Sequence, residues 1–231
     1  MTLRLRLPPP GTLNAIGKWD PLRFYYKPLV GRVFQARINA GLQLLEGRYR
    51  RLLEVGYGSG LLMPTLAGIA DEIYGADIEP EPAGLRANLE RLGVRPRDLV
   101  QADIQSLPFP DGYFDAVIAF SILEHLKRDA LHVAAGEVAR VLQPDGVFLV
   151  GCPAVHRVMN AAFRAIGFKG IEDHHFSGIQ HVLRACAPHF EASRKAALPG
   201  AFGGALPLGW APYTTVLFVR RGLRQRDGTH A

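Results

Sequence analysis

The stretch LLEVGYGSG, from Leu52 to Gly60, decides the fold that this 231-residue sequence predicts. It overlaps a buried strand expected over Arg51 to Val55 and precedes a helix expected over Leu61 to Ala70. Between them stand three glycines, Gly56, Gly58 and Gly60. Without Cβ atoms the chain can bend sharply there, and a flat ligand can lie against its backbone. Because ligands of doubly wound sheets bind at this first strand-to-helix turn, the stretch indicates a cofactor-binding α/β fold.

The rest of the chain alternates between strand and helix patterns. The apolar run Phe114 to Phe120 is typical of a strand that is buried on both faces. Further strands are expected over Glu72 to Asp77, Asp98 to Ala102, Val147 to Val150, Phe190 to Ala197 and Tyr213 to Val219. Helices are expected from near Pro80 to a stop at Gly93, from Leu131 to Leu142 before a turn at Pro144 to Gly146, and over Ile179 to Ala187. This order predicts one mostly parallel sheet with helices on both faces.

The regions outside this alternation have patterns of their own. Apolar residues at helical spacing predict one or two amphipathic helices over Pro21 to Gly47, and the opening MTLRLRLPPPG is expected to be a loose arm. Residues 196–219 carry no charge, but three prolines interrupt them, so a plain membrane-spanning helix is not expected. The expected units are an N-terminal arm and helical cover over residues 1–46, a main domain over residues 47–219 and a disordered basic tail over residues 220–231.

Lys and Arg outnumber Asp and Glu by six, but the excess lies at the two ends. Residues 1–37 hold seven basic residues and one acid, and residues 220–231 hold four and one. A nucleic-acid enzyme more often spreads basic residues over its core, so no nucleic-acid partner is expected. The basic ends are a solubilising fringe, a peripheral contact with an anionic membrane or a contact with an acidic substrate. Two cysteines are too few for a disulfide framework, which favours a reducing, cytoplasmic location.

The glycine spacing differs from the dinucleotide-binding fingerprint, in which the third glycine follows the second by three positions. Leu61 stands at that position, so a nicotinamide cofactor is disfavoured without being excluded. Asp77 ends the second strand, where a carboxylate can accept hydrogen bonds from both hydroxyls of a ribose. Asp103 follows the third strand and is placed to meet the amine of an adenine, with Ile78 and Ile104 on the two faces of the ring. These residues predict a ligand that contains adenosine.

Longer motifs make the sequence resemble the class I S-adenosylmethionine-dependent methyltransferases, in particular the methyltransferase type 11 group. The motif E-x-G-x-G-x-G occupies residues 54–60, and LPFPDGYFD occupies residues 107–115. SILEHL at residues 121–126 and EVARVLQPDGVFLVGCP at residues 137–153 extend the resemblance, which starts near residue 50. It implies a Rossmann-like, seven-stranded sheet in the order 3-2-1-4-5-7-6 with an antiparallel last strand.

The resemblance also implies S-adenosyl-L-methionine as the cofactor. It assigns the ribose to Asp77, the adenine to Asp103 with Ile104, and a position near the sulfonium to Ser121. The residues implied to shape the methionine side are Glu54, Gly56, Gly58 and Gly60. Tyr57 departs from the family, which usually has a small residue or Cys there. Its ring is expected to line the substrate side or to narrow the cofactor entrance.

Two histidines are candidates for a catalytic base. His125 follows the fourth strand and His156 follows the fifth, and imidazole exchanges protons near neutral pH. A structural or cofactor-side role is the alternative for His125. His174, His175 and His181 resemble metal ligands, but methyl transfer from a sulfonium needs no metal, so no metal is expected.

Aromatic residues outside the sheet are candidate acceptor contacts. Tyr25 and Tyr26 lie in the helical leader, and Phe202 and Trp210 lie in the uncharged loop that is expected to overhang the pocket. Capping of the core is the alternative role. Together with Tyr57, they favour a small, apolar or lipid-like acceptor, and the resemblance implies methyl transfer to it by in-line displacement at the sulfonium. The alternative functions are a cofactor-binding protein without transfer activity and a nicotinamide-dependent oxidoreductase.

Overall fold

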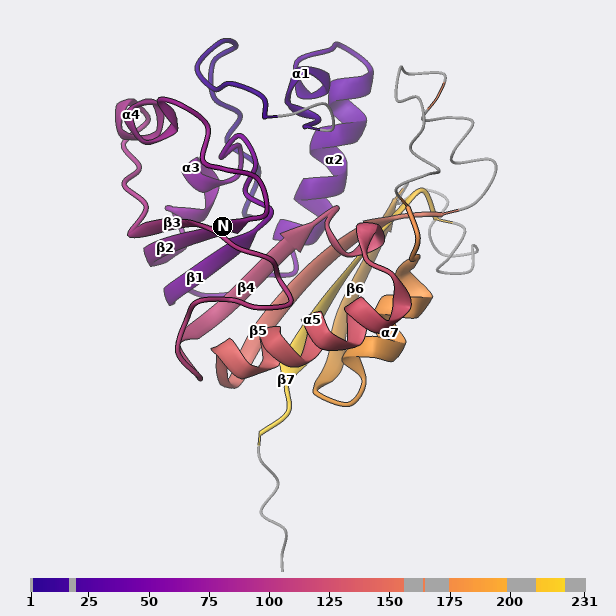
Figure 1. Cartoon of the computed structure of the whole chain (residues 1–231). Helices are drawn as coiled ribbons and strands as arrows, with labels where there is room; N and C mark the ends of the chain where they lie inside the picture. The colour runs from indigo at the N-terminus through magenta and orange to yellow at the C-terminus, as the bar shows by residue number, and fades with distance from the viewer. Residues whose placement is uncertain (1, 17–19, 156–163, 165–174, 199–210, 223–231) are drawn as a thin grey trace, which may run out of the picture.

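The computed structural model describes residues 2–16, 20–155, 164, 175–198 and 211–222. In these ranges, seven strands form one sheet with the order β3-β2-β1-β4-β5-β7-β6 (Figure 1). The strands are β1 (Tyr49–Val55), β2 (Ala70–Asp77), β3 (Asp98–Gln101), β4 (Phe114–Phe120), β5 (Leu142–Pro153), β6 (Phe190–Leu198) and β7 (Tyr213–Arg220). Strands β1 to β5 pair in parallel, whereas β7 pairs antiparallel with both β5 and β6. The strand order and the antiparallel last strand confirm the prediction.

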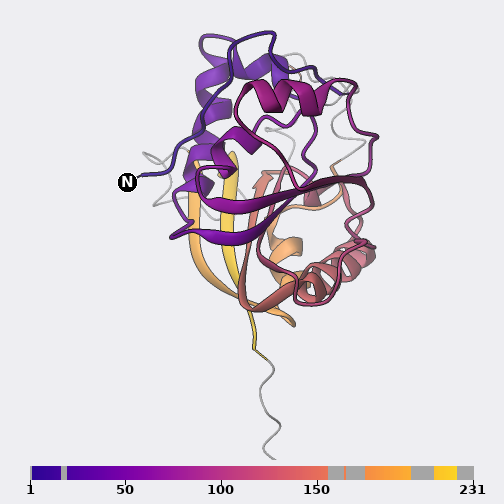
Figure 2. The same cartoon turned by 90° about the vertical axis from the view of Figure 1, so that its left-hand side faces the viewer.

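Helices cover both faces of this sheet. They are α1 (Leu22–Tyr25), α2 (Val30–Leu42), α3 (Met63–Leu66), α4 (Leu85–Arg91), the 3-10 helix η1 (Leu123–His125), α5 (Arg128–Val141) and α7 (Ile179–Cys186). Side chains of α2, α3 and α4 pack in one hydrophobic cluster and those of α5 and α7 in another, on opposite sides of the sheet (Figure 2). None of the helices in the described ranges combines the length and the apolarity that a membrane span requires.

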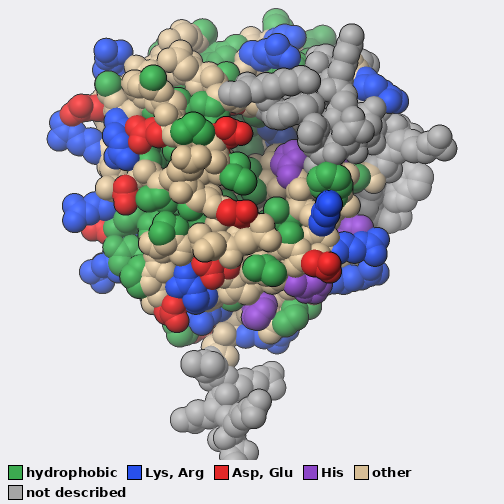
Figure 3. Space-filling model, viewed as in Figure 1, with side chains coloured by type: hydrophobic (Ala, Val, Ile, Leu, Met, Phe, Trp, Pro, Cys, Tyr) green, Lys and Arg blue, Asp and Glu red, His purple; other side chains and the backbone are tan. Residues whose placement is uncertain are grey.

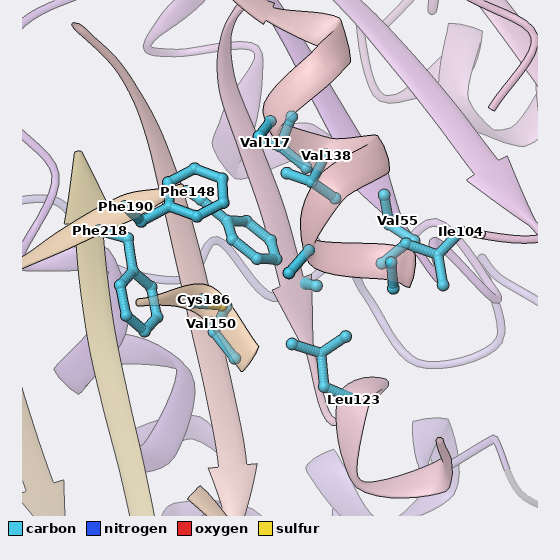
Figure 4. Packing of buried hydrophobic residues seen from close by; sticks show 14 of the residues in the cluster. Val55, Ile104, Val117, Leu123, Val138, Phe148, Val150, Cys186, Phe190 and Phe218 are labelled. Carbon is cyan, nitrogen blue, oxygen red and sulfur yellow. The ribbon is translucent and has the colours of Figure 1, made fainter. Parts of the chain in front are cut away.

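Alternate residues of the central strands belong to the two hydrophobic clusters. In β5, Phe148 and Val150 pack toward α5 and α7, whereas Leu149 packs toward α2. Figure 4 shows Val117, Phe148 and Val138 of α5 packed together on the first of these faces. Because both faces of β4 and β5 are covered, the residues 116–119 of β4 and 148–153 of β5 are buried, as the apolar run Phe114 to Phe120 predicts for β4.

The first residues of the chain pack against the domain, so the expected loose arm is wrong. The Leu5 N–H donates to Asn39 Oδ1 of α2 at 2.7 Å, and the Arg6 N–H donates to Thr65 Oγ1 at 2.8 Å. Over residues 3–7 the leucines are partly buried and the arginines are exposed. The alternation of Leu and Arg is therefore that of an extended segment with one face on the core.

Three predicted boundaries are wrong. The helix expected over Leu61 to Ala70 is reduced to the single turn α3, because turns of the i to i+3 type precede and follow it and Ala70 already belongs to β2. Helix α4 begins at Leu85, since Gly84 has a left-handed φ of 76° that separates it from the proline-rich loop. The turn expected at Pro144 to Gly146 lies inside β5, where the register with β4 shifts.

Charged side chains are mixed on the face that Figure 3 shows. Lys and Arg side chains lie among Asp and Glu side chains there, without one large basic patch over the described residues. Exposed ion pairs on the surface of the described residues have the same mixed character, for example Arg48 with Asp71 and Arg86 with Glu81.

Candidate active site

A cavity of about 280 Å³ lies beyond the C-terminal ends of β1, β2 and β4, and residues of α1 and α2 close it from the other side. This is the edge at which doubly wound sheets bind ligands. Eight of the residues predicted for the site line it, namely Tyr25, Glu54, Gly56, Tyr57, Gly58, Asp77, Ser121 and His125. Segments far apart in the sequence thus meet at one place.

The glycine turn after β1 forms one wall of the cavity. Gly56 has a φ of 73°, which favours glycine, and its N–H donates to the Ala76 carbonyl of β2 at 2.7 Å. A Cβ on Gly56 would lie 1.9 Å from Ile122 Cδ1. The side chain that follows β4 therefore already fills the space beside Gly56, and a larger residue there would push this wall apart.

Asp77, the last residue of β2, holds the glycine turn in place. Its Oδ2 accepts a hydrogen bond from the Gly58 N–H at 2.8 Å, and its Oδ1 accepts one from the Glu79 N–H at 2.9 Å. The residue is only 8% exposed and lines the cavity. Each carboxylate oxygen has a further lone pair, so both can still accept a hydroxyl hydrogen. This arrangement fits the two neighbouring hydroxyls of a ribose.

Glu54 and Tyr57 bring two unpartnered oxygens to the same wall. Within the described structure, Glu54 Oε2 and Tyr57 Oη are buried and have no hydrogen-bond partner. Burial and the nearby charge of Asp77 raise the pKa of Glu54 well above its usual range, and burial raises the pKa of Tyr57 to about 12. A positively charged ligand group beside Glu54 would stabilise its ionised form and offset the repulsion between Glu54 and Asp77. This part of the cavity therefore fits a cationic ligand that also carries hydroxyls.

Other residues predicted for the cofactor do not line this cavity. Ile78 is 67% exposed, and Asp103 accepts hydrogen bonds from the Gln105 N–H at 2.9 Å and from the Gln105 side chain. Ile104 is buried in the core beside Val55 (Figure 4). Their contact with an adenine stays a prediction. Gly60 and Tyr26 also lie outside the lining, and His156, His174, Phe202 and Trp210 lie outside the described residues.

A buried arginine that the sequence reasoning missed stands on the opposite wall. Arg37 of α2 donates from Nη1 to Ser121 Oγ and from Nη2 to Tyr25 Oη, both at 3.1 Å. Ser121 Oγ lies 3.0 Å from Tyr213 Oη, and the guanidinium carbon lies 4.4 Å from the centroid of the Phe34 ring. We call Arg37, Tyr25, Ser121 and Tyr213 the Arg37 cluster. The sequence held one clue to Arg37, because this residue lies between the apolar positions 34 and 38 of the amphipathic helix.

Glu124 of η1 is a second residue that the sequence reasoning missed. It is 0% exposed, and its Oε2 accepts a hydrogen bond from Cys152 Sγ at 3.8 Å. Its Oε1 is buried and has no partner among the described residues. Burial raises the pKa of Glu124 to about 8, although Arg37 and Ser121 act in the opposite direction. Glu124 is therefore mostly uncharged at neutral pH.

Two histidine rings lie beside Glu124. The rings of His125 and His175 are 5.1 Å apart, and ligand atoms of the two residues and of Glu124 all lie within 4.8 Å of one another. Such a group can exchange protons or hold a metal ion. The sequence pointed to His174, His175 and His181 as the histidines that resemble metal ligands. His181 is not part of the observed group, and its Nδ1 accepts a hydrogen bond from the Gly178 N–H at 3.3 Å at the start of α7.

Asp20 connects the N-terminal segment to the glycine turn. Its carboxylate accepts hydrogen bonds from the Ile16 N–H at 3.0 Å and from the Leu22 N–H at 2.8 Å. Burial raises its pKa, while hydrogen bonds from Ser59 oppose that effect. Since Asp20 also lines the cavity, the cover over the site is fastened directly to the turn.

Comparison with known proteins gives the site its chemical context. Residues 53–150 match the family described as "Methyltransferase domain". A protein of Mycolicibacterium smegmatis, described as a "Probable S-adenosylmethionine-dependent methyltransferase", is 38% identical over 105 residues. That match covers 45% of this chain and 38% of the relative, so the chain spans well under half the length of that relative.

Other relatives match over more of their length. The ubiquinone/menaquinone biosynthesis C-methyltransferase UbiE of Methylobacterium nodulans is 32% identical over 185 residues, covering 75% of this chain and 70% of that protein. The phosphatidylethanolamine N-methyltransferase of Cereibacter sphaeroides is 33% identical over 140 residues, covering 60% and 68%. The crystal structure of the N-methyltransferase NodS from Bradyrhizobium japonicum WM9, in complex with S-adenosyl-L-homocysteine, has a TM-score of 0.61 at 18% identity, covering 89% of this chain and 94% of that chain. This last likeness shows a shared fold.

Proposed function

Because the chain belongs to the class I S-adenosylmethionine-dependent methyltransferases, we propose that it transfers a methyl group to a small acceptor of apolar or lipid-like character. The observation that carries this proposal is a single cavity with an acidic part and an aromatic part. Bound S-adenosyl-L-methionine supplies a methyl group on a positively charged sulfur. The residues of the chain therefore act mainly by holding the reactants in line, an effect worth roughly 7–11 kcal/mol.

We assign the donor to the acidic part, beside the ends of β1 and β2. Asp77 would accept hydrogen bonds from the ribose hydroxyls there, and the unpartnered Oε2 of Glu54 would accept one from the amino group of the methionine moiety. The glycine turn gives the backbone wall, and Ser121 lies on the side of the sulfonium. Ile78, Asp103 and Ile104, which lie outside the lining of the cavity, would hold the adenine, as the family resemblance implies.

We assign the acceptor to the part beside β4 and α2. Phe34, Ile38 and Phe120 give apolar surface there, with Tyr25 and Tyr57 at its borders. The relatives named for ubiquinone/menaquinone biosynthesis and for phosphatidylethanolamine support an acceptor with a lipid-like body. Tyr26, Phe202 and Trp210 stay candidate contacts for the part of the acceptor that leaves the cavity.

His125 is our candidate for the group that receives a proton from the acceptor. It is exposed and lines the cavity, so solvent can carry the proton away. Imidazole suits this role because its pKa lies near neutral pH. His156 stays the second candidate.

Residues 1–46 act in this proposal as a cover that opens and closes. The cavity of about 280 Å³ falls slightly below the roughly 300–1,000 Å³ of typical small-molecule sites. In this proposal the cover moves outward to admit donor and acceptor together.

The test is transfer of label from S-adenosyl-L-methionine that is radioactive in its methyl group. The full chain is incubated with this donor and with lipid and water-soluble fractions of a cell extract. We expect a labelled product in the organic-soluble fraction and none with heat-treated protein. If the chain binds S-adenosylhomocysteine but labels no fraction, it is a binding protein and the proposed transfer is refuted.

A further inference from the structure

The Arg37 guanidinium is a buried cation without a paired carboxylate in the described ranges. No Asp or Glu oxygen described there forms an ion pair with it, and its Nε has no hydrogen-bond partner. Its neutral partners Tyr25 and Ser121 satisfy only part of its hydrogen-bonding capacity. Burying a charge is costly unless an opposite charge accompanies it. A ligand is therefore the natural source of that charge.

The position of Arg37 in the fold separates it from the donor. Its partner Ser121 follows β4, and Tyr213 of the same cluster begins β7 opposite Pro153 of β5. Asp77 ends β2, and β1 lies between β2 and β4 in the sheet. The Arg37 cluster thus faces the acceptor part of the cavity, whereas the acidic residues face the donor part.

The described groups around Arg37 give it no paired anion. Burial raises the pKa of Tyr213 far above neutrality, so this phenol is uncharged at neutral pH. The Glu124 carboxyl accepts a hydrogen bond from Cys152 Sγ and forms no ion pair with Arg37 within the described ranges. The side chains that the guanidinium contacts by hydrogen bonds in the acceptor part are therefore the hydroxyls of Tyr25 and Ser121.

We propose that Arg37, Tyr25 and Ser121 form an oxyanion-binding site, and that the acceptor is held through an ionised oxygen on an apolar body. The inference rests on the proposed function and names its substrate class, phenols and carboxylic acids. The apolar body packs on Phe34, and the oxygen meets the guanidinium. An acceptor with an ammonium group is disfavoured, because it would place a second buried cation beside Arg37.

The test compares three probes of similar shape on the unaltered chain with S-adenosylhomocysteine present. They are 4-nitrophenolate, neutral 4-nitroanisole and 4-nitrobenzylammonium. We expect 4-nitrophenolate to bind at least about tenfold more tightly than either of the others, as a charge-assisted hydrogen bond allows. Its visible absorbance should also show that the bound phenol stays ionised at a lower pH than the free one. Equal affinities, a preference for the ammonium or no binding of the phenolate overturns the proposal.

The variants Arg37→Gln and Tyr25→Phe locate the effect. Arg37→Gln should abolish the preference for the phenolate, and Tyr25→Phe should reduce it severalfold. The matched control is Arg32→Gln, which removes an exposed charge from the same helix and should keep the preference. S-adenosylhomocysteine is titrated separately, and that titration tests the proposed function. If Arg37→Gln weakens S-adenosylhomocysteine and 4-nitrophenolate by the same factor, Arg37 serves the donor and the oxyanion site for the acceptor is refuted.

Discussion

Replacing Glu124 by Gln should change how the stability of the protein depends on pH. Burial raises the pKa of this carboxyl to about 8 in the folded chain, against about 4.5 for an unburied glutamate. Between these two values the folded state keeps a proton that the unfolded state releases. The free energy of unfolding therefore falls as pH rises from about 4.5 to about 8, and levels off above that.

The size of this change in the free energy of unfolding follows from the difference between the two pKa values. A difference of about 3.5, at about 1.4 kcal/mol for each pKa unit, gives an upper limit of about 5 kcal/mol. Glutamine has nearly the same shape and cannot ionise, so the Glu124→Gln variant lacks this loss. We expect the variant to gain up to about 5 kcal/mol relative to the unaltered chain between about pH 5 and about pH 9.

Urea unfolding followed by circular dichroism at the two pH values measures this difference. The control is Glu191→Gln on β6, an exposed carboxyl whose replacement should shift stability equally at both pH values. Other buried acids such as Glu54 remain in every variant, so their own contributions cancel in the comparison. If Glu124→Gln changes the free energy of unfolding by the same amount at both pH values, Glu124 ionises freely and our reading of its environment is wrong.

Three further substitutions test other parts of the structure. Gly56→Ala should abolish binding of S-adenosylhomocysteine in calorimetry, because the new Cβ collides with Ile122. The control is Gly84→Ala, since Gly84 is also left-handed but has open space around it. That variant should lose only about 1–2 kcal/mol of stability and should still bind. Asn39→Ala should destabilise the fold by roughly 1 kcal/mol in urea unfolding by releasing the Leu5 N–H, and an unchanged midpoint would show that the first residues do not pack. Arg140→Leu should lower the free energy of unfolding by roughly 1–3 kcal/mol at neutral pH. The loss should become smaller as pH falls, because Glu137, whose pKa Arg140 lowers, then becomes protonated. A loss that does not change with pH would contradict the ion pair between Arg140 and Glu137.

The central sheet, and the meeting of the glycine turn with Asp77 at one edge of it, were predictable from the sequence. Strands buried on both faces give continuous apolar runs, and a glycine turn followed by an acid at the end of the next strand marks the edge at which ligands bind. The structure brings Gly56 and Asp77 together at that edge, where Asp77 accepts a hydrogen bond from the turn itself. These residues lie at the ends of consecutive strands, so the pattern could be recognised from the sequence alone.

The acceptor part was not predictable in the same way. Arg37 and Ser121 are 84 residues apart, and only the packing of α2 on the sheet brings them together. Glu124 lies in a motif that was recognised, yet the motif alone does not tell that its carboxyl is buried beside Cys152. The expected loose arm was wrong for a related reason, since the partners of Leu5 and Arg6 lie on α2 and at Thr65. Long-range packing therefore decides the part of the cavity that we propose for the acceptor.

Binding of S-adenosylhomocysteine to the full chain and to Asp77→Ala, measured by calorimetry, tests the central claim most directly. We predict one site per chain, and an affinity roughly ten to a hundred times lower in the variant, because the carboxylate supplies charge-assisted hydrogen bonds. Asp71→Ala, an exposed acid at the other end of the same strand, should bind like the unaltered chain. Equal affinity of Asp77→Ala and the unaltered chain, or no binding by either, would contradict the account.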